Sequence, residues 1–296
     1  MARPLRKSSC YLLATGLATI FVLAVSVTLS TAAAAPARPT AKLSFVRGNS
    51  IFVSRADGSG ISMVLRGTKK KVYFDPAWSP NGRRLAVARE TYPFDTHGYD
   101  DVLVFQGSRR PLPVPSGDSD INGNPAWAPD GRKIVLVNYE FGDGGALYTA
   151  RPGSSSSRAV ERNHDEDFVD NDPSWSPNGR AIAFSRSAGS KSGLYLISPA
   201  GTHIRRLTKT PAFNPSWSPD GRRLVFDNGR AINVINADGS GLRKLLPKAG
   251  RDPAWSPDGR TIAFVRNGSV WLMSSRGAHV RTAVRNADQP TWKVGS

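Results

Sequence analysis

From about residue 41 onward, the chain consists of short apolar or alternating segments separated by turn signals. In the last complete unit, the segments Thr261–Val265, Ser269–Met273 and His279–Val284 are separated by Asn267-Gly268 and by Ser275–Gly277. Alternation of apolar and polar residues over a few positions is typical of half-buried β-strands. The Pro-Asp-Gly sequence that opens the unit favours a tight turn, because proline fixes φ and glycine accepts a positive φ.

The same unit recurs along the chain. A Pro-x-Trp step occurs six times, and five copies lead into Ser/Ala-Pro-(Asp/Asn)-Gly-Arg. The tryptophans are 49, 48, 42, 38 and 37 residues apart: Trp78, Trp127, Trp175, Trp217, Trp255 and Trp292. A period in this range marks a repeat architecture, and four short strands per repeat form one propeller blade. The sequence therefore predicts an all-β, six-bladed β-propeller.

The two ends of the repeat region complement each other. Residues 42–65 contain three strand-like segments that match the second, third and fourth strands of a blade, without a leading Pro-Trp strand. Residues Gln289–Val294 supply such a strand at the C-terminus. We therefore expect the C-terminal Pro-Trp strand to join the N-terminal three strands and close the ring, which leaves no sheet edge exposed.

Each Pro-x-Trp segment is expected to be the first, innermost strand of its blade. Proline cannot donate a hydrogen bond to a strand ladder and is confined to edge strands or strand starts. Proline and tryptophan, two residues apart, then share one face of that strand. The tryptophans are therefore predicted to pack between adjacent blades rather than to contact a ligand.

The repeated unit Pro-x-Trp-Ser-Pro-Asp-Gly-Arg-x-Ile-Ala-Phe resembles the WD-like repeat of the TolB β-propeller family, and the resemblance covers residues 41–296. It implies a six-bladed propeller that serves as a binding platform more than as a catalyst of one reaction. TolB itself carries an α/β domain ahead of its propeller and works in the periplasm with a lipoprotein partner. Here an Ala/Pro-rich linker precedes the blades, and the resemblance covers the propeller part of TolB.

The first 35 residues differ in kind from the repeats. Arg3, Arg6 and Lys7 precede an uncharged stretch from Tyr11 to Leu29, and small residues follow. This order is that of a secretory signal peptide. The expected domains are residues 1–35 as signal peptide, 36–40 as linker and 41–296 as propeller. The uncharged stretch is long enough to span a bilayer, so an uncleaved membrane anchor is the alternative.

The single cysteine, Cys10, lies ahead of the apolar stretch, whereas a lipoprotein cysteine would follow it. Cleavage would leave a chain without thiols, stabilised by its core alone. We therefore expect an exported protein, either periplasmic, cell-wall-associated or secreted, or in the alternative held at a membrane.

The charge is distributed unevenly. The formal net charge is +17, yet residues 90–172 hold 15 of the 23 acidic residues and only 7 of the 40 basic ones. In a propeller, this region supplies connections on one face of three consecutive blades, and loops on a rigid scaffold are where binding residues concentrate. This acidic sector is the predicted partner-binding site: Asp95, His97, Asp100, Asp101, Glu140, Asp143, His164, Asp165, Glu166, Asp167 and Asp170.

Two further features are predicted on the same face. The residue before each Pro-x-Trp proline carries a side-chain oxygen, and the six should ring the channel mouth: Asp75, Asn124, Asp172, Asn214, Asp252 and Gln289. These residues either bond local backbone or hold water, a cation or an inserted peptide. The sequence from Asp118 to Gly123 matches the opening half of a calcium loop, with Asp118, Asp120 and Asn122 as candidate ligands. The twelfth position is Pro129 rather than a bidentate Glu, so a solvated acidic loop is the alternative.

These features favour a non-enzymatic, monomeric protein- or peptide-binding scaffold with no cofactor other than the candidate Ca²⁺. The sequence contains neither a Gly-x-Ser-x-Gly nucleophile elbow nor a His-Glu-x-x-His zinc helix. The alternative is a metal-assisted lyase or hydrolase acting on an envelope polysaccharide or peptide, with His97 and His164 in the acidic sector.

The basic remainder of the chain indicates an anionic neighbour. Its clusters include Lys69–Lys71, Arg83-Arg84, Arg205-Arg206, Arg222-Arg223 and Arg243-Lys244. Export and the lack of a stacking motif disfavour nucleic acid. An anionic envelope polymer, membrane headgroups or an acidic protein are the expected classes.

Overall fold

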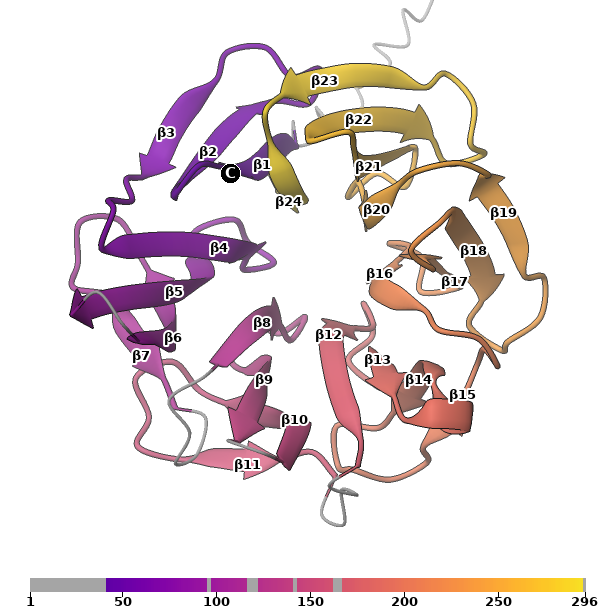
Figure 1. The fold of residues 1–296 in the computed structure, drawn as a ribbon, viewed down its shortest axis with the longest axis horizontal. Helices are drawn as coiled ribbons and strands as arrows, with labels where there is room; N and C mark the ends of the chain where they lie inside the picture. The colour runs from indigo at the N-terminus through magenta and orange to yellow at the C-terminus, as the bar shows by residue number, and fades with distance from the viewer. Residues whose placement is uncertain (1–40, 95–96, 116–121, 141–142, 162–166, 295–296) are drawn as a thin grey trace, which may run out of the picture. The chain divides into compact units, whose positions relative to one another are not determined.

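The computed structural model describes residues 41–94, 97–115, 122–140, 143–161 and 167–294. Within these ranges, the strands form six four-stranded antiparallel sheets around a central axis, and Gly189–Lys191 forms a short 3-10 turn (Figure 1). No helix in this part of the chain is long and apolar enough to cross a membrane. The prediction of an all-β, six-bladed propeller is confirmed.

The strands of each sheet follow one another outward from the axis. From the innermost to the outermost strand, the blades are β4–β7 (Lys71–Trp78, Leu85–Phe94, His97–Phe105, Leu112–Val114), β8–β11 (Asn122–Trp127, Ile134–Glu140, Asp143–Ala150, Ser157–Ala159), β12–β15 (Val169–Trp175, Ile182–Ser187, Gly193–Ile197, Arg205–Arg206), β16–β19 (Phe213–Trp217, Arg223–Asp227, Ile232–Asn236, Arg243–Leu246), β20–β23 (Arg251–Trp255, Thr261–Arg266, Ser269–Ser274, Arg281–Arg285) and β24–β1–β2–β3 (Asp288–Lys293, Lys42–Arg47, Ser50–Arg55, Ser62–Leu65).

The ring closes as the sequence predicts. Strand β24, at the C-terminal end, pairs antiparallel with β1, at the N-terminal end, and Leu43 lies opposite Trp292. Leu43 and Phe45 of β1 are fully buried, so the closing blade has its own apolar interior. Figure 1 shows β24 completing the circle of innermost strands beside β4 and β20.

The core lies between neighbouring blades. For example, Val225 and Ile232 of blade β16–β19 pack with Trp255, Ile262 and Phe264 of blade β20–β23. Burying an aliphatic or aromatic side chain of this size contributes about 1.5–3 kcal/mol. Because each such layer joins two blades, the blades stabilise one another around the ring.

The repeated tryptophans lie at these blade interfaces, as predicted. The indole Nε1 of Trp127 donates to the carbonyl oxygen of Ala77 in the preceding blade, at 3.0 Å. Trp217 donates to Ser174 at 3.1 Å in the same way. Trp292 bonds the carbonyl of Ala254 at 3.0 Å, which joins the closing blade to blade β20–β23. The tryptophans of the Pro-x-Trp motif therefore help to join neighbouring blades.

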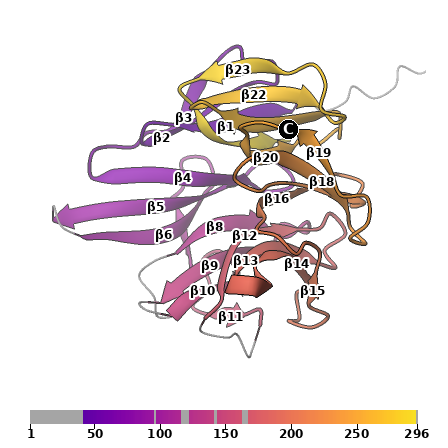
Figure 2. The ribbon, with the colours of Figure 1, turned by 45° about the vertical axis from the view of Figure 1, so that its right-hand side comes forward.

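The acidic segments of the first two complete blades are hairpins rather than the irregular loops that the sequence suggested. Glu90 pairs with Asp100 and Thr91 with Tyr99, so β5 continues to Phe94 and β6 begins at His97 (Figure 2). Strands β9 and β10 likewise continue to Glu140 and from Asp143. The prediction of long loops here was wrong, because β-branched and aromatic residues continue the ladder and its hydrogen bonds satisfy the backbone.

Candidate functional site at the channel mouth

Two faces of the propeller follow from the strand order. The loop face carries the connections from second to third strands and from each blade to the next, whereas the turn face carries the turns from first to second and from third to fourth strands. Each first strand begins on the loop face and ends, after its tryptophan, on the turn face. The channel mouth is therefore the opening of the ring on the loop face.

Each innermost strand is bulged at the residue before its proline. The register of its pairing with the second strand shifts at this point in all six blades. The residue before the proline has a left-handed backbone, with φ between 46° and 52°, at Asp75, Asn124, Asp172, Asn214, Asp252 and Gln289. Asn and Asp adopt this conformation more readily than most residues, so their recurrence has a backbone cause. These six residues are referred to as the mouth ring.

The mouth ring is joined by hydrogen bonds that cross from blade to blade. The backbone N–H of Asp75 donates to Gln289 Oε1 at 2.9 Å, and Gln289 Nε2 donates to Asp75 Oδ1 at 2.6 Å. The N–H of Asn124 donates to Asp75 Oδ2 at 3.2 Å. The bonded N–H thus belongs to the neighbouring blade, whereas the local-backbone interpretation placed the bond within the residue's own turn or strand start.

Asp172 is a hub of the mouth ring. Its carboxylate accepts hydrogen bonds from Asn124 Nδ2 at 3.1 Å, from the Asn214 N–H at 3.1 Å and from Ser185 Oγ at 3.0 Å. Burial raises the pKa of Asp172, and the neighbouring Asp227 adds to this effect, while the bonds from Asn214 and Ser185 oppose it. One side chain thus holds together three consecutive blades.

A second hub, Asp227, lies behind the mouth ring. This buried carboxylate at the end of β17 accepts from Asn214 Nδ2 at 2.9 Å and from the Asp252 N–H at 3.1 Å. It occupies the role that Asp172 plays for the preceding blades. The sequence did not single out Asp227, because a lone Asp that follows an apolar strand carries no motif.

The mouth ring continues into an ion-paired cluster at blade β20–β23. Arg251 forms ion pairs with Asp252 and, at 2.5 Å, with Asp288. Burial raises the pKa of Asp252 to about 7; Arg251 lowers it, while Asp288, Asp227 and Asp172 raise it. Burial would also raise the pKa of Asp288, but hydrogen bonds from Arg251 and the Gln289 N–H hold that pKa below its usual value. Asp252 therefore changes charge near neutral pH.

All six blades contribute to one depression at this mouth. It has a volume of about 580 Å³ and is lined by the six mouth-ring residues, by the prolines that follow them and by small residues such as Ala77 and Ser174. The lining presents carboxylate and amide oxygens, together with one guanidinium, that of Arg251. Such a site suits cations, amines and backbone N–H donors. The prediction that it holds a ligand stays a prediction.

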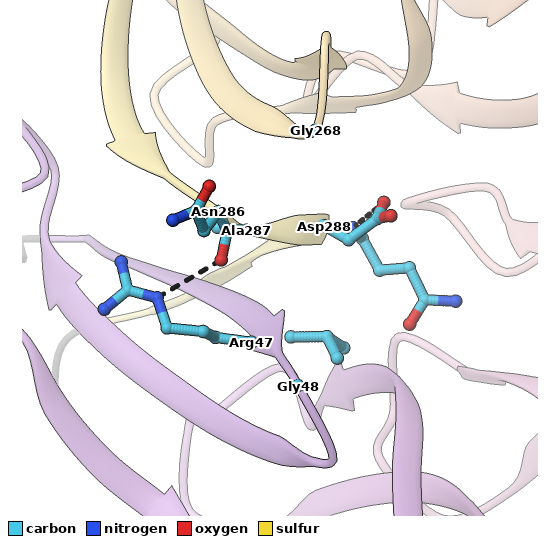
Figure 3. A pocket seen from close by; sticks show the side chains of 8 residues that line it. Arg47, Gly48, Gly268, Asn286, Ala287 and Asp288 are labelled. Carbon is cyan, nitrogen blue, oxygen red and sulfur yellow. Dashed lines mark hydrogen bonds between the residues drawn. The ribbon is translucent and has the colours of Figure 1, made fainter.

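A smaller pocket of about 370 Å³ adjoins the mouth where blades β20–β23 and β24–β3 meet (Figure 3). Arg47 closes one side, since its Nε donates to the Asn286 carbonyl at 3.2 Å and its Nη2 to the Arg285 carbonyl at 2.9 Å. Asp288 and Gln289 line this pocket as well, and Gln289 also lines the larger depression. The two hollows therefore share a wall.

Residues of the predicted acidic sector have different surroundings. Asp101 forms an ion pair with Arg89 on the paired strands β5 and β6, and Asp167 is exposed. Asp170 is 1% exposed and forms a two-point ion pair with Arg186, with both bonds at 2.7 Å. Asp170 is thus an interior residue that needs Arg186 as its partner, because an unpaired buried carboxylate would destabilise the fold.

The structure says less about the remaining predicted site residues. His97 and Asp100 lie in β6, Glu140 ends β9 and Asp143 begins β10. Asn122 is buried within strand β8 rather than in an open loop. Outside the described residues lie the other candidates: Asp95, Asp118, Asp120, His164, Asp165 and Glu166. In the described part of the chain, no group of three or more His, Cys, Asp or Glu residues is placed to hold a metal ion.

The site residues that sequence reasoning missed are Asp227, Arg251 and Asp288. Arg251 and Asp288 each directly precede a mouth-ring residue, so the repeat alignment could have marked them. Their pairing could not be read from the sequence, because they are 37 residues apart and meet only where two blades adjoin.

The molecule is therefore a closed six-bladed propeller with a polar, carboxylate-rich channel mouth. The model of the TolB beta propeller domain matches residues 120–293, which is more than half of the chain, and the protein belongs to this family. No curated protein matches its sequence.

Solved structures have the same fold. TolB from Acinetobacter baumannii has a TM-score of 0.69 and 16% identity, covering 86% of this chain and 66% of that one. A putative TolB from Agrobacterium tumefaciens has a TM-score of 0.65 and 21% identity, covering 83% and 88%. A chain of a nidogen/laminin complex has a TM-score of 0.70 at 11% identity, covering 86% and 98%. This chain thus spans about two thirds of the Acinetobacter TolB.

Proposed function

We propose that the protein is an exported, non-enzymatic scaffold that binds a protein or peptide partner on its loop face. The observation that carries this proposal is the depression of about 580 Å³ that all six blades build around the channel axis. Its lining of fixed oxygen atoms offers acceptors for the N–H groups and cationic side chains of a partner. The surplus of acidic residues in the segment 90–172 favours a partner with a basic segment.

The relatives support a binding role of this kind. The nidogen structure that shares the fold was solved as a complex with laminin, another protein. The family is represented by TolB propellers, whose periplasmic location supports export. The signal-like residues 1–35 support the same location, and cell-wall-associated, secreted and membrane-anchored forms are variants of it.

The test is affinity capture from the native envelope with the immobilised propeller, in which the partner identified with the unchanged protein is then measured against two variants. Reversal of Asp165, Glu166 and Asp167 to Lys is expected to weaken binding of that partner at least about tenfold, since like charges across an interface repel. The matched control reverses three exposed cations of the turn face, Arg132, Arg180 and Arg222, to Glu and should retain the partner. Unchanged binding by the acidic-sector variant would overturn the assignment of this sector.

A propeller enzyme is the second candidate, because a puromycin hydrolase structure also matches the fold, with a TM-score of 0.60 and 12% identity. A metal-assisted lyase or hydrolase would use His97 and His164 together with neighbouring carboxylates. Metal analysis of the purified protein distinguishes the two. A stoichiometric divalent metal that is lost in His97→Ala or His164→Ala would favour the enzyme over the scaffold.

A further inference from the structure

The turn face of the propeller carries a ring of exposed arginines around the axis. Each Pro-(Asp/Asn)-Gly turn ends in an exposed arginine: Arg83, Arg132, Arg180, Arg222 and Arg260. The turns lie side by side, since a Cβ at Gly131 would be 3.6 Å from Pro80 and one at Gly179 would be 3.2 Å from Pro129 of the preceding blade. The five turns, each with an exposed arginine, thus follow one another around the axis on the turn face.

The turns hold the backbones of these arginines in place. In each turn, the Asn or Asp side chain accepts the N–H of the arginine that follows, for example Arg132 to Asp130 Oδ1 at 2.8 Å and Arg180 to Asn178 Oδ1 at 3.0 Å. Two of the five turns carry a neutral Asn in place of Asp. Three Asp residues therefore offset only part of the charge of the five exposed arginines.

Ion pairing differs between the two faces. Among the described residues, the ion pairs join Arg89, Arg186 and Arg251 to carboxylates at the loop-face side of their blades. The arginine ring takes part in none of them. Exposed cations of the outer turns on the turn face reinforce the ring, and they include Arg109, Arg110, Arg151, Arg243 and Arg276.

The rim of the turn face also exposes aliphatic side chains at one repeated position. Leu112 begins the fourth strand of its blade, and the other four residues directly precede theirs. The exposed fractions are 41% for Ile61, 40% for Leu112, 44% for Ile204, 55% for Leu242 and 37% for Val280. Single exposed aliphatic residues are ordinary on protein surfaces. Here, however, an aliphatic side chain is exposed at the equivalent position of five blades, on the same face as the arginine ring.

The combination selects one class of partner. A soluble polyanion would use the arginines and gain nothing from exposed aliphatic side chains. A lipid surface uses both, because anionic headgroups attract cations and the boundary of the acyl chains accepts small apolar groups. We propose that the turn face docks on an anionic membrane surface, with the arginine ring against the headgroups and the aliphatic rim inserted beside them.

The path of the chain is consistent with this orientation. Strand β1 begins at Lys42, opposite Lys293 at the end of β24, and so the described chain enters the propeller on the turn face. In the sequence, the apolar stretch Tyr11–Leu29 precedes this point. The loop face, with its mouth ring, is then directed away from the lipid and accessible to a protein partner.

The test uses residues 41–296, because this part contains every strand of the closed ring and all six core clusters. It also lacks the apolar stretch, which would itself partition into lipid. Vesicles of phosphatidylglycerol and phosphatidylcholine are expected to co-sediment with this protein, whereas vesicles of phosphatidylcholine alone are not. Binding should be lost in high salt, because exposed charges are screened.

Three variants separate the contributions. Replacement of the five ring arginines by Gln is expected to weaken vesicle binding at least about tenfold. Ile204→Ser, Leu242→Ser and Val280→Ser together should weaken it by a smaller factor and leave its salt dependence in place. The matched control replaces five exposed loop-face cations by Gln and should bind as the unchanged protein does: Lys69, Lys70, Lys209, Arg230 and Lys248.

Two results would overturn the proposal. In the first, the loop-face control loses as much vesicle binding as the arginine-ring variant. Vesicle binding would then depend on the net charge of the protein and not on the turn face. In the second, the aliphatic variant binds unchanged and soluble poly(glycerol phosphate) competes fully with vesicles, which would make an anionic polymer the partner. Circular dichroism melting of each variant separates lost binding from lost folding. Because these measurements use vesicles alone, their outcome is independent of the loop-face partner.

Discussion

At the scale of single residues, the mouth ring combines a structural and a chemical role. The left-handed backbone before each proline suits Asp and Asn, and the side chains placed there connect one blade to the next. The same geometry concentrates carboxylates in a chain with a formal net charge of +17. Burial then brings the pKa of Asp252 to about 7, so the ring is sensitive to pH.

Asp252 is expected to make stability depend on pH. Its folded pKa of about 7 lies above the ordinary value of 3.8, so the folded state retains a proton that the unfolded chain releases. Its stabilising contribution is therefore full below about pH 4 and is lost as the pH rises through about 7. Relative to the unchanged protein, Asp252→Asn should gain about 1–2 kcal/mol of unfolding free energy between about pH 5 and about pH 8.

Urea denaturation of both proteins across this range measures that gain. The expected gain in unfolding free energy is smaller than the whole pKa shift of Asp252 would give, because Asp252 is partly solvated and paired with Arg251. A difference between the two proteins that stays constant with pH would contradict the assignment of the titration to Asp252.

The calcium prediction also belongs to this scale. If Asp118 and Asp120 bind Ca²⁺, the cation should raise the melting temperature of the unchanged protein, since a ligand that binds only the folded state stabilises it. Asp118→Ala should abolish the shift. Thermal melts with Ca²⁺ and with a chelator measure it, and Asp57→Ala on the turn face is the control. No shift in the unchanged protein would reject the site.

At the scale of elements, the first strand of each blade determines how the blades join. Its bulge places a mouth-ring residue near the loop face. Its tryptophan, nearer the turn face, packs against the preceding blade. The tryptophans are not equivalent: Trp127 Nε1 bonds the Ala77 carbonyl at 3.0 Å, whereas the buried Trp175 Nε1 has no hydrogen-bond partner. Blade interfaces with the same repeated tryptophan therefore differ in whether its indole N–H is hydrogen-bonded.

That difference can be measured with a matched pair of substitutions. Trp127→Phe removes the bond to Ala77 and weakens the contact with the Arg84 guanidinium, which lies 4.4 Å from the Trp127 ring centre. We expect it to cost about 1–2 kcal/mol more unfolding free energy than Trp175→Phe, because Trp175 loses no hydrogen bond. Chemical denaturation of the two variants gives the comparison. Equal costs would show that packing area alone decides the contribution of these tryptophans.

At the scale of the whole molecule, stability depends on closure. Without β24, strand β1 would be an open edge, and the core around Leu43 and Trp292 would lose one wall. Closure also completes the mouth ring, since the Gln289 side chain of β24 both accepts a hydrogen bond from the Asp75 N–H and donates one to the Asp75 carboxylate. A stable fold and a complete channel mouth therefore depend on the same strand.

Truncation tests this dependence. Removal of residues 289–296 is expected to lower the melting temperature by about 10 °C or more and to promote association through the exposed edge of β1. Removal of residues 295–296 alone leaves β24 whole and is the control. Calorimetry and light scattering report the two effects. A truncated chain that melts as the control does would show that the ring does not need closure.

Much of this architecture could be predicted because the repeat is local. Pro-Asp-Gly turns, alternating strands and the spacing of the tryptophans specify blades through short-range chemistry, and the unmatched segments at the two ends implied closure. The acidic hairpins were misjudged as loops, since acidic side chains at the ends of strands resemble loop composition. Asp170 was placed on the surface for the same reason, although it pairs with Arg186 in the interior.

The sequence by itself determined the number of blades, the position of each first strand and the location of the tryptophans between blades. Only the tertiary structure decided which charges meet. Residues such as Asp172 and Asn214, or Arg251 and Asp288, are brought together by the circular arrangement of the blades, which no periodic pattern specifies. The tertiary structure likewise gathers arginines on the turn face and carboxylates at the loop-face mouth, because the first strands of all six blades run in the same direction around one axis.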